Sequence, residues 1–437
     1  MQNHIKDTVA MTYYQLSPEQ LCAEYTRVKA EYDALCARGL HLDLSRGKPS
    51  AEQLDLSEGM LSHPISGKEC ITEDGIDCRN YGLFEGLPGM RRLFSDLTGV
   101  PEKQILVAGN SSLALMYDTI SRAMIFGLAR SPRPWCREEK RKFICPAPGY
   151  DRHFAITELF GFELITVDMT PTGPDMDAVE AIVRDDPTVK GIWCVPMYSN
   201  PTGVTYSDET VRRLAEMETA APDFVIMWDN AYSIHDLKFH GDKLLDIFPV
   251  AEAAGHEDRI FYYTSFSKVT FAGGAIAMMA MSENNINIMR PIQGVRTIGY
   301  DKINQLRHLM FLKDAEHTRD HMRRHAAIIL RKLTILYDAL DTELADAGVA
   351  EWTHPRGGYF VSMNTPDGCA KRVWELCHNA GVTLTPAGAT FPYGIDPRDR
   401  NLRIAPTYPS DAELAEAAHV LACVVRLASL EKLLHKI

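Results

Sequence analysis

Short apolar runs alternate with helix-length segments through the middle of the chain. Between about residues 104 and 282 these runs are QILVAG, KFICPA, FELITVDM, VKGIWCVP, DFVIMWD, RIFYYTS and AIAMMAMS. Strands that are apolar along their whole length are typical of a mostly parallel sheet covered by helices on both faces. The pattern predicts an α/β fold with a seven-stranded sheet, in which ligands gather beyond the carboxyl ends of the strands.

Helical signals flank this region on both sides. Ser17 and Gln20 form a capping-box pattern before apolar residues at helical spacing, and Ser410 and Glu413 form another near the C-terminus. Residues 303–347 predict one or two long helices, and PRGGYFVSMN predicts a strand. Both ends of the chain are therefore expected to build a smaller α+β domain. The expected divisions are an N-terminal helix and arm (1–55), a large domain (56–305) and the C-terminal part of the small domain (306–437).

Composition narrows the function classes. At 437 residues the chain exceeds the roughly 250–300 residues that one core supports. A net charge of -12 leaves no basic field for nucleic acid or anionic lipid, so the expected ligands are small molecules. The ten cysteines show no CxxC pair, which predicts reduced thiols and no metal site. The longest apolar run is about half the ~20 residues that span a bilayer, and the first residues lack a secretion signal, so we expect a cytoplasmic protein.

Lys268 is the most distinctive candidate for chemistry. It follows an apolar strand in Thr264-Ser265-Phe266-Ser267-Lys268 and precedes a turn of small residues. Lysine forms Schiff bases, and burial lowers its pKa so that the neutral amine is available near pH 7. Taken alone, a lysine at the end of a strand is more often one that reaches into water.

Two further strands end in groups that would suit a bound aromatic ring. Asp229 and Tyr232 follow one strand and could pair with a pyridinium nitrogen and a phenolate oxygen, although an aspartate here also commonly caps a helix. Asn200 lies in an Asn-Pro-Thr-Gly turn that presents its amide to the same sheet edge.

The remaining candidates follow two other strands. Asn110, Ser111 and Ser112 join a strand to a helical segment, where backbone amides and hydroxyls could bind a phosphate or act as plain caps. Tyr150 could stack on a flat ring, or simply pack. Together these groups favour a planar, aldehydic, phosphorylated ligand, which is pyridoxal 5'-phosphate.

The chain resembles the class I/II aminotransferases of the fold-type I pyridoxal-phosphate enzymes from about Gly47 to Arg403. The resemblance is carried by N-P-T-G (Asn200 to Gly203), W-D-N-A-Y (Trp228 to Tyr232), S-F-S-K (Ser265 to Lys268), R-G-G-Y-F (Arg356 to Phe360) and N-L-R-I-A (Asn401 to Ala405). The segments S-R-G-K-P-S and S-F-S-K-V-T-F-A-G-G are most similar to a bacterial subgroup of aspartate aminotransferases.

The resemblance implies a role for each matched residue. Lys268 would hold the cofactor as a Schiff base and shuttle protons, Asp229 would pair with the ring nitrogen, and His153 would stand behind Asp229. Tyr232 and Asn200 would bind the phenolate oxygen, and Tyr150 would stack on the ring. The phosphate would be bound by Asn110, Ser111, Ser112 and Ser265. Arg403, Asn200 and Gly47 would bind the substrate, with Arg403 gripping the α-carboxylate.

Tyr81, in a Tyr-x4-Gly arrangement with Gly86, is similar to a tyrosine that reaches the phosphate of a neighbouring subunit, so a homodimer with shared active sites is expected. One position departs from the family. Family members commonly carry a phosphate-binding arginine about eight residues after the lysine, whereas residue 276 is isoleucine. Serines, amides and a partner's Thr297 hydroxyl could compensate, or the segment could be remodelled.

The expected function is therefore transamination between an amino acid, L-aspartate by the subgroup resemblance, and 2-oxoglutarate. Aromatic, branched or alanine donors and a pyridoxal-phosphate lyase are the alternatives. A ligand-sensing regulatory module is a non-enzymatic alternative, but only one helix precedes the matched region. Candidates for binding a distal carboxylate are Arg46, Lys48, Arg79 and Arg296.

Overall fold

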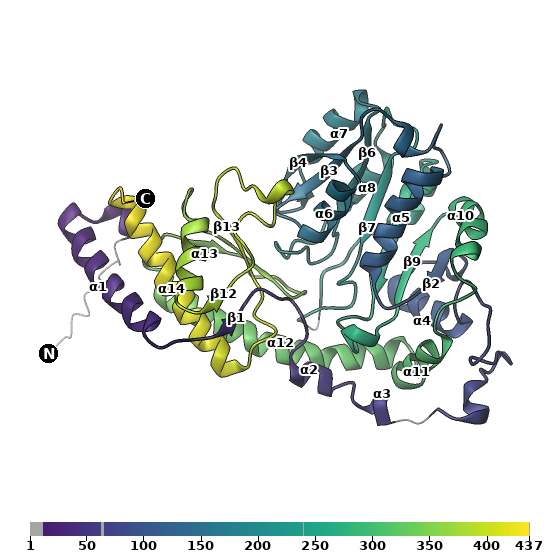
Figure 1. Ribbon diagram of the computed structural model, residues 1–437, viewed down its shortest axis with the longest axis horizontal. Coiled ribbons are helices and arrows are strands. Elements are labelled where there is room, and N and C mark those ends of the chain that lie inside the picture. The colour runs from purple at the N-terminus through teal and green to yellow at the C-terminus, as the bar shows by residue number, and fades with distance from the viewer. Residues whose placement is uncertain (1–11, 63–64, 239, 437) are drawn as a thin grey trace.

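A computed structural model describes residues 12–62, 65–238 and 240–436 of the chain. It contains a large lobe built on one extended sheet and a small lobe formed by both ends of the chain (Figure 1). Residues 1–11 of the expected N-terminal arm, where a secretion signal was sought, lie outside the described residues. No helix among the described residues is both long and apolar enough to cross a bilayer.

All seven predicted apolar runs form strands of the large sheet. Within the described residues this sheet has eight strands in the order β2-β9-β8-β7-β6-β3-β4-β5. Pairing is parallel from β8 to β4, whereas β9 runs antiparallel to both of its neighbours and β5 runs antiparallel to β4. The strands are β2 (Ile105–Val107), β3 (Lys142–Ala147), β4 (Glu163–Thr170), β5 (Gly173–Pro174), β6 (Val189–Cys194), β7 (Val225–Asp229), β8 (Ile260–Ser265) and β9 (Ala277–Met281).

Helices cover both faces of the large sheet. Alternate residues of one strand point to opposite faces, so Ile226 and Trp228 of β7 join one core while Val225 and Met227 join the other. The first core includes residues of α4 (Pro88–Thr98), α7 (Met176–Asp185), α8 (Asp208–Glu216) and α9 (Ile247–Ala253). The second includes residues of α5 (Ser112–Phe126), α6 (Asp151–Leu159) and α10 (Glu283–Arg296). Both faces of the sheet are therefore buried beneath helices, as the continuously apolar strands predict.

The small lobe joins segments from the two ends of the chain. Strand β1 (Leu42–Asp43) pairs in parallel with β12 (Val382–Thr383), and β11 (Val361–Asn364) pairs with β10 (Glu351–Trp352) and β13 (Asn401–Ile404). Helix α1 (Pro18–Cys36) packs along α14 (Asp411–Leu433), as Figure 1 shows, and α13 (Ala370–Asn379) packs on α14. The capping boxes predicted at the starts of α1 and α14 are both present.

Helix α12 connects the two lobes. Residues 303–347, predicted as one or two helices, form α11 (Lys302–Leu312) and the 30-residue α12 (Ala315–Leu344). Two short helices, α2 (Ala51–Asp55) and α3 (Gly59–Ser62), follow β1 in the chain. Helix α12 contacts α4 of the large lobe and α14 of the small lobe. Met322 belongs to the large-lobe core and Leu340 to the small-lobe core. The expected division at 305/306 stays a prediction.

Candidate functional site

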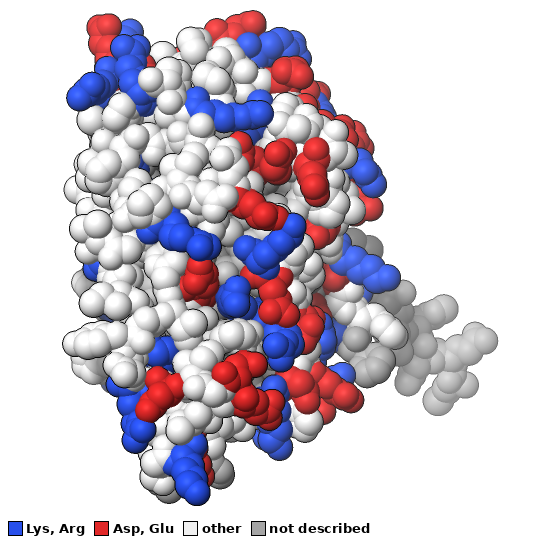
Figure 2. Space-filling model, turned by 90° about the vertical axis from the view of Figure 1, so that its right-hand side faces the viewer, with Lys and Arg blue, Asp and Glu red and all other residues white. Residues whose placement is uncertain are grey.

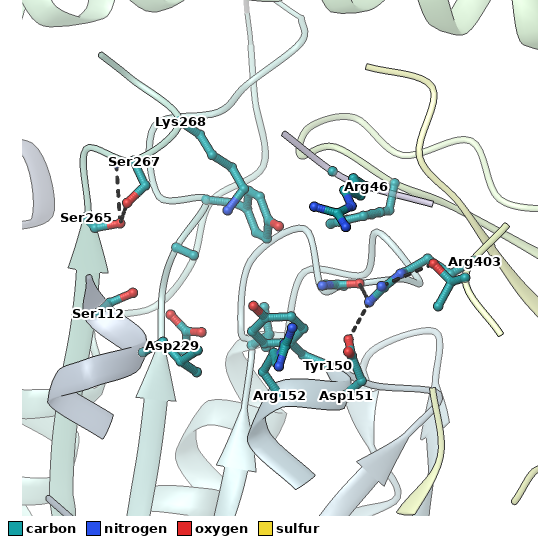
Figure 3. Close-up of a pocket in the computed structure, with 18 of the residues that line it drawn as sticks. Arg46, Ser112, Tyr150, Asp151, Arg152, Asp229, Ser265, Ser267, Lys268 and Arg403 are labelled. Atoms are coloured by element: carbon teal, nitrogen blue, oxygen red, sulfur yellow. Dashed lines mark hydrogen bonds and ion pairs between the residues drawn. The ribbon is translucent and has the colours of Figure 1, made fainter. Parts of the chain in front are cut away.

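The carboxyl ends of neighbouring strands border one cavity with a volume of about 560 Å³ (Figure 3). Asp229 ends β7 and Ser265 ends β8, while Tyr150 and Asn200 follow β3 and β6. These four strands are adjacent in the sheet, so their ends meet at one edge although they are far apart in sequence. The small lobe closes the cavity from the other side.

Most of the predicted site residues line this cavity. They are Gly47, Ser111, Ser112, Tyr150, Asn200, Asp229, Tyr232, Ser265, Lys268 and Arg403. Two predicted residues do not line it. The Asn110 side chain turns away and donates to the Gly273 carbonyl oxygen at 3.2 Å, and Tyr81 is 84% exposed on the surface.

Lys268 extends into the cavity from the segment after β8 (Figure 3). Its Nζ lies 5.1 Å from the centre of the Tyr232 ring and 6.0 Å from that of Tyr359. Burial lowers the pKa of the Lys268 ammonium, and the negative charge of Asp229 opposes this effect. A lysine with a lowered pKa supplies more of the neutral amine, which is the form that attacks a carbonyl carbon.

Asp229 carries an unpartnered oxygen. The residue is 4% exposed, and its Oδ2 lies 2.9 Å from Nε2 of His153, whose ring stacks on Trp193 with centroids 4.4 Å apart. Oδ1 is buried and has no hydrogen-bond partner in the described parts of the chain. A buried carboxylate oxygen without a donor is costly, so this atom fits a ligand that brings an N–H group, such as a protonated ring nitrogen.

Serines and a helix N-terminus gather on one side of the cavity (Figure 3). Helix α5 begins at Ser112, and the Ser111 hydroxyl accepts from the Ala114 amide at 3.3 Å. Across from it, the Ser265 hydroxyl donates to the Ser267 hydroxyl at 3.0 Å. Free amides at the start of a helix together with hydroxyls fit a phosphate group.

Position 276, where the resemblance implies an arginine, points away from this cluster. Ile276 is 1% exposed and belongs to the core beneath the sheet. The Thr297 hydroxyl, considered as a contribution from a partner, donates to the Gly299 carbonyl oxygen of its own chain at 2.9 Å. Within the described residues, the side of the cavity that would bind a phosphate thus provides serines and helix amides, with no cation at position 276.

Arg403 lies on the opposite side of the cavity (Figure 3) and is 8% exposed. Its Nη1 donates to Asp151 Oδ1 at 2.7 Å and to Asn200 Oδ1 at 3.4 Å, and its Nη2 donates to the Thr385 hydroxyl at 3.2 Å. The guanidinium carbon lies 5.2 Å from the centre of the Phe360 ring. The aromatic ring and these acceptors hold the guanidinium in one orientation.

Gly47 lines the cavity beside the same ring. A Cβ atom at this position would lie 2.1 Å from Cζ of Phe360, so any other residue would displace the ring against which Arg403 rests. The sequence needs glycine here for close packing.

Of the cations proposed for a distal carboxylate, only Arg46 lines the cavity among the described residues. The others have partners elsewhere. Lys48 Nζ lies 3.7 Å from the centre of the Tyr408 ring, Arg79 pairs with Asp77 at 2.6 Å, and Arg296 pairs with Asp118 at 2.7 Å.

Several residues that line the cavity were not predicted from the sequence. Asp151 and Arg152 directly follow Tyr150, so their position next to a predicted ring contact could have indicated them. Phe360 lies in the R-G-G-Y-F motif but was given no role. Thr385 had no sequence signal, because only the folded small lobe brings it to Arg403.

Side chains from outside the large sheet hold the backbone that carries Lys268. The Tyr359 hydroxyl donates to the Lys268 carbonyl oxygen at 3.4 Å, and His321 Nε2 donates to the Val269 carbonyl oxygen at 2.8 Å. The Thr270 hydroxyl lies 2.9 Å from His308 Nε2. Three consecutive residues are thus bonded by side chains of α11, α12 and the segment before β11, and this fixes the base of the lysine.

The histidines around this segment predict acid sensitivity. Burial lowers the pKa of His235 and His325 to about 3 and that of His308 to about 4, all below the ordinary 6.5. Between pH 6.5 and these lowered values the unfolded chain therefore binds more protons than the folded chain. The contribution of these histidines to stability is complete above pH 6.5 and falls as the pH decreases through this window. Between pH 7 and 5.5 each histidine is expected to cost roughly 1 kcal/mol of unfolding free energy.

The measurement is the midpoint of unfolding of the cofactor-free protein across this pH range. His325→Gln, which cannot take up a proton, should flatten the dependence, whereas the exposed His317→Gln should not. An unchanged slope in His325→Gln would contradict the assignment.

Comparisons with known proteins agree on one family. The family model described as aspartate amino-transferase matches residues 16–436. An aspartate aminotransferase of Corynebacterium glutamicum is 47% identical over 92% of this chain and 93% of its own length, and a putative aminotransferase of Mycolicibacterium smegmatis is 46% identical over 97% and 99%.

Solved structures give the same result. A crystal structure of an aspartate transaminase from C. glutamicum superposes with a TM-score of 0.94 at 45% identity, covering 97% of this chain and 99% of the other. An α-aminoadipate aminotransferase from Thermus thermophilus, complexed with N-(5'-phosphopyridoxyl)-L-leucine, has a TM-score of 0.72 at 22% identity over 94% of this chain and 98% of its own. This second likeness shows the fold.

Proposed function

Since the chain belongs to the aspartate amino-transferase family, we propose that it uses pyridoxal 5'-phosphate to transfer the amino group of L-aspartate to 2-oxoglutarate. The observation that carries the cofactor assignment is the buried, unpartnered Oδ1 of Asp229 in the same cavity as the Lys268 amine. An acid and an amine with a lowered pKa are the two groups that this cofactor requires.

The cavity offers a complementary group for each part of the cofactor. Asp229 would accept from the ring nitrogen, and Tyr232 and Asn200 would contact the phenolate oxygen. Tyr150 would lie against the ring. The phosphate would be bound by Ser111, Ser112, Ser265 and the N-terminus of α5. When bound, the cofactor supplies an electron sink that stabilises the carbanion at the substrate Cα.

The residues of the chain divide the remaining work. Lys268 would hold the cofactor through its neutral amine, and its Nζ would hold and return the proton that leaves the substrate Cα. Arg403 binds the substrate α-carboxylate through two parallel N–H groups, and Phe360 keeps the guanidinium in place. His153 orients Asp229 through its Oδ2 and leaves Oδ1 for the cofactor.

Preference for a dicarboxylic donor is supported by two unpaired cations. Arg46 and Arg152 both line the cavity, and neither guanidinium has an ion pair or hydrogen bond within the described residues. Figure 3 shows Arg152 beside Tyr150 and Arg46 on the other side of the cavity. A distal carboxylate would meet a free cation there, whereas the side chain of alanine would meet none.

Replacing Arg152 by alanine is expected to lower kcat/KM for L-aspartate by roughly 10- to 100-fold, because a hydrogen bond to a charged group is worth about 1.5–3 kcal/mol. The value for alanine should change little. A panel of amino donors assayed with 2-oxoglutarate measures this, with Arg46→Ala as the second test and the exposed Arg184→Ala as control.

The same panel separates the alternatives. Faster turnover of aromatic, branched or alanine donors would reassign the substrate, and release of pyruvate and ammonia would indicate a lyase. A regulatory module would show no turnover.

A homodimer with shared active sites is supported by apolar side chains on the surface. Tyr81 is 84% exposed, and Ile298 is 63% exposed on the neighbouring segment, where Gly299 lies against Gly82. Val295, one turn earlier, is 91% exposed. Figure 2 faces the side of the large lobe that holds α4 and α10, and part of this view is largely free of charged side chains. Such a surface is typical of an interface between subunits, and Tyr81 would reach the partner's phosphate.

A cytoplasmic location is supported by the thiols. All ten cysteines lie in the described residues and all are free, including the exposed Cys22 and Cys136. Free exposed thiols persist in a reducing compartment.

A further inference from the structure

Arg403 is already paired with a carboxylate of its own chain. Its Nη1 lies 2.7 Å from Oδ1 of Asp151, and this is its one ion pair within the described residues. The other acceptors, on Asn200 and Thr385, are neutral. The guanidinium is therefore neutralised before any substrate binds.

Asp151 lies at the N-terminus of a helix. It is the first residue of α6, where the free amides and the helix dipole favour a negative charge. Its side chain is 32% exposed, against 9% for that of Arg403, and both residues line the cavity. Figure 3 shows the pair reaching from the large lobe to the small lobe across the cavity wall.

A substrate α-carboxylate requires the same guanidinium. A carboxylate binds arginine best through two parallel N–H groups, and Asp151 engages one of the Nη1 protons. We propose that Asp151 competes internally with the substrate α-carboxylate for Arg403 and so limits how tightly anions bind in the cavity. The proposal rests on the proposed function in one respect, the role of Arg403.

Competition of this kind sets how tightly any anion binds in the cavity. The Asp151 carboxylate weakens every anion at Arg403 by the same factor, so an ion that contacts only Arg403 does not fill the cavity at ordinary concentrations. A dicarboxylic amino acid would have further contacts, with Arg46, Arg152 and the cofactor, and these would offset the loss. The ratio of the two affinities stays the same, but only the ligand with the further contacts remains bound.

The test is the affinity of the holoenzyme for succinate, an unreactive dicarboxylate, measured by calorimetry. Asp151→Asn is expected to bind succinate roughly tenfold more tightly, because Arg403 loses its internal counter-ion. Asp151→Glu keeps the charge and should bind succinate as the natural protein does. The control is Asp177→Asn, since Asp177 is also the first-turn acid of a helix and pairs with Arg213 at 2.6 Å outside the cavity.

Kinetics gives an independent reading of the same competition. In Asp151→Asn the KM for L-aspartate should fall while kcat does not rise, and chloride should become an inhibitor. Asp151→Ser removes the charge without introducing an amide and should act in the same direction if Asp151→Asn folds poorly.

Equal or weaker succinate binding in folded Asp151→Asn and Asp151→Ser would overturn the competition, because Asp151 would then merely hold Arg403 in position. Arg403→Ala should lose succinate binding. If it bound succinate as well as the natural protein, the role of Arg403 in the proposed function would fail as well, so the two failures are distinguishable.

Discussion

Replacing Lys268 by alanine is expected to abolish transamination, with a fall in kcat of roughly 10²–10⁴-fold or more. Lys268 is the one lysine that lines the cavity with Asp229 within the described residues, and its amine is also the group proposed to move the proton at Cα. Burial lowers the pKa of Lys268, so its neutral amine is more available than that of a lysine exposed to solvent.

The measurement is single-turnover conversion of L-aspartate. The absorbance at the edge of the visible spectrum, which accompanies attachment of the cofactor to lysine, is followed at the same time. Lys268→Arg is the matched control, since arginine keeps a positive charge but stays protonated and cannot form the bond. Both variants should lose the absorbance and the activity. Full turnover in either would contradict the assignment of Lys268.

The second large effect is expected at Asp229. Asp229→Asn removes the negative charge of the carboxylate, whose Oδ1 is unpartnered. This should weaken cofactor binding by roughly 10- to 100-fold, since a hydrogen bond to a charged group is worth about 1.5–3 kcal/mol. Turnover of the saturated enzyme should also fall, because the ring nitrogen would lose the anion that keeps it protonated.

Cofactor affinity is measured by titrating the cofactor-free protein. Asp223→Asn is the matched control, because Asp223 is an equally buried aspartate that pairs with Lys190 at 3.0 Å and accepts from Trp135 outside the cavity. It should lower the unfolding midpoint and leave cofactor affinity unchanged. Equal cofactor affinity in Asp229→Asn and the natural protein would contradict the role of Asp229.

The large sheet could be predicted because its signal is local. Strands such as β6 and β7 are buried on both faces, so each is a continuous apolar run that is visible in the sequence. Strand β5 was missed because Gly173 and Pro174 carry no strand signal and pair only through the turn after β4. Capping boxes were likewise visible, because the interaction spans three residues.

The candidate site divides in the same way. Asp229, Ser265 and Lys268 follow strands that are adjacent in the sheet, so their convergence follows from the fold alone. Asp151 and Arg403 are 252 residues apart, and their ion pair depends on how the two lobes close, which no local pattern records. Asn110 was expected at the phosphate, but its amide is used by the Gly273 carbonyl of a neighbouring turn.

Helix α12 places a constraint on how this chain can change in length. Because α12 is one unbroken helix of 30 residues, inserting a single residue would rotate everything beyond it by about 100° relative to what precedes it. The side chains that pack on α4 and those that pack on α14 would then no longer face their partners together. Insertions and deletions that preserve this architecture are therefore expected in surface loops, because the length of α12 fixes how the two lobes are placed relative to each other.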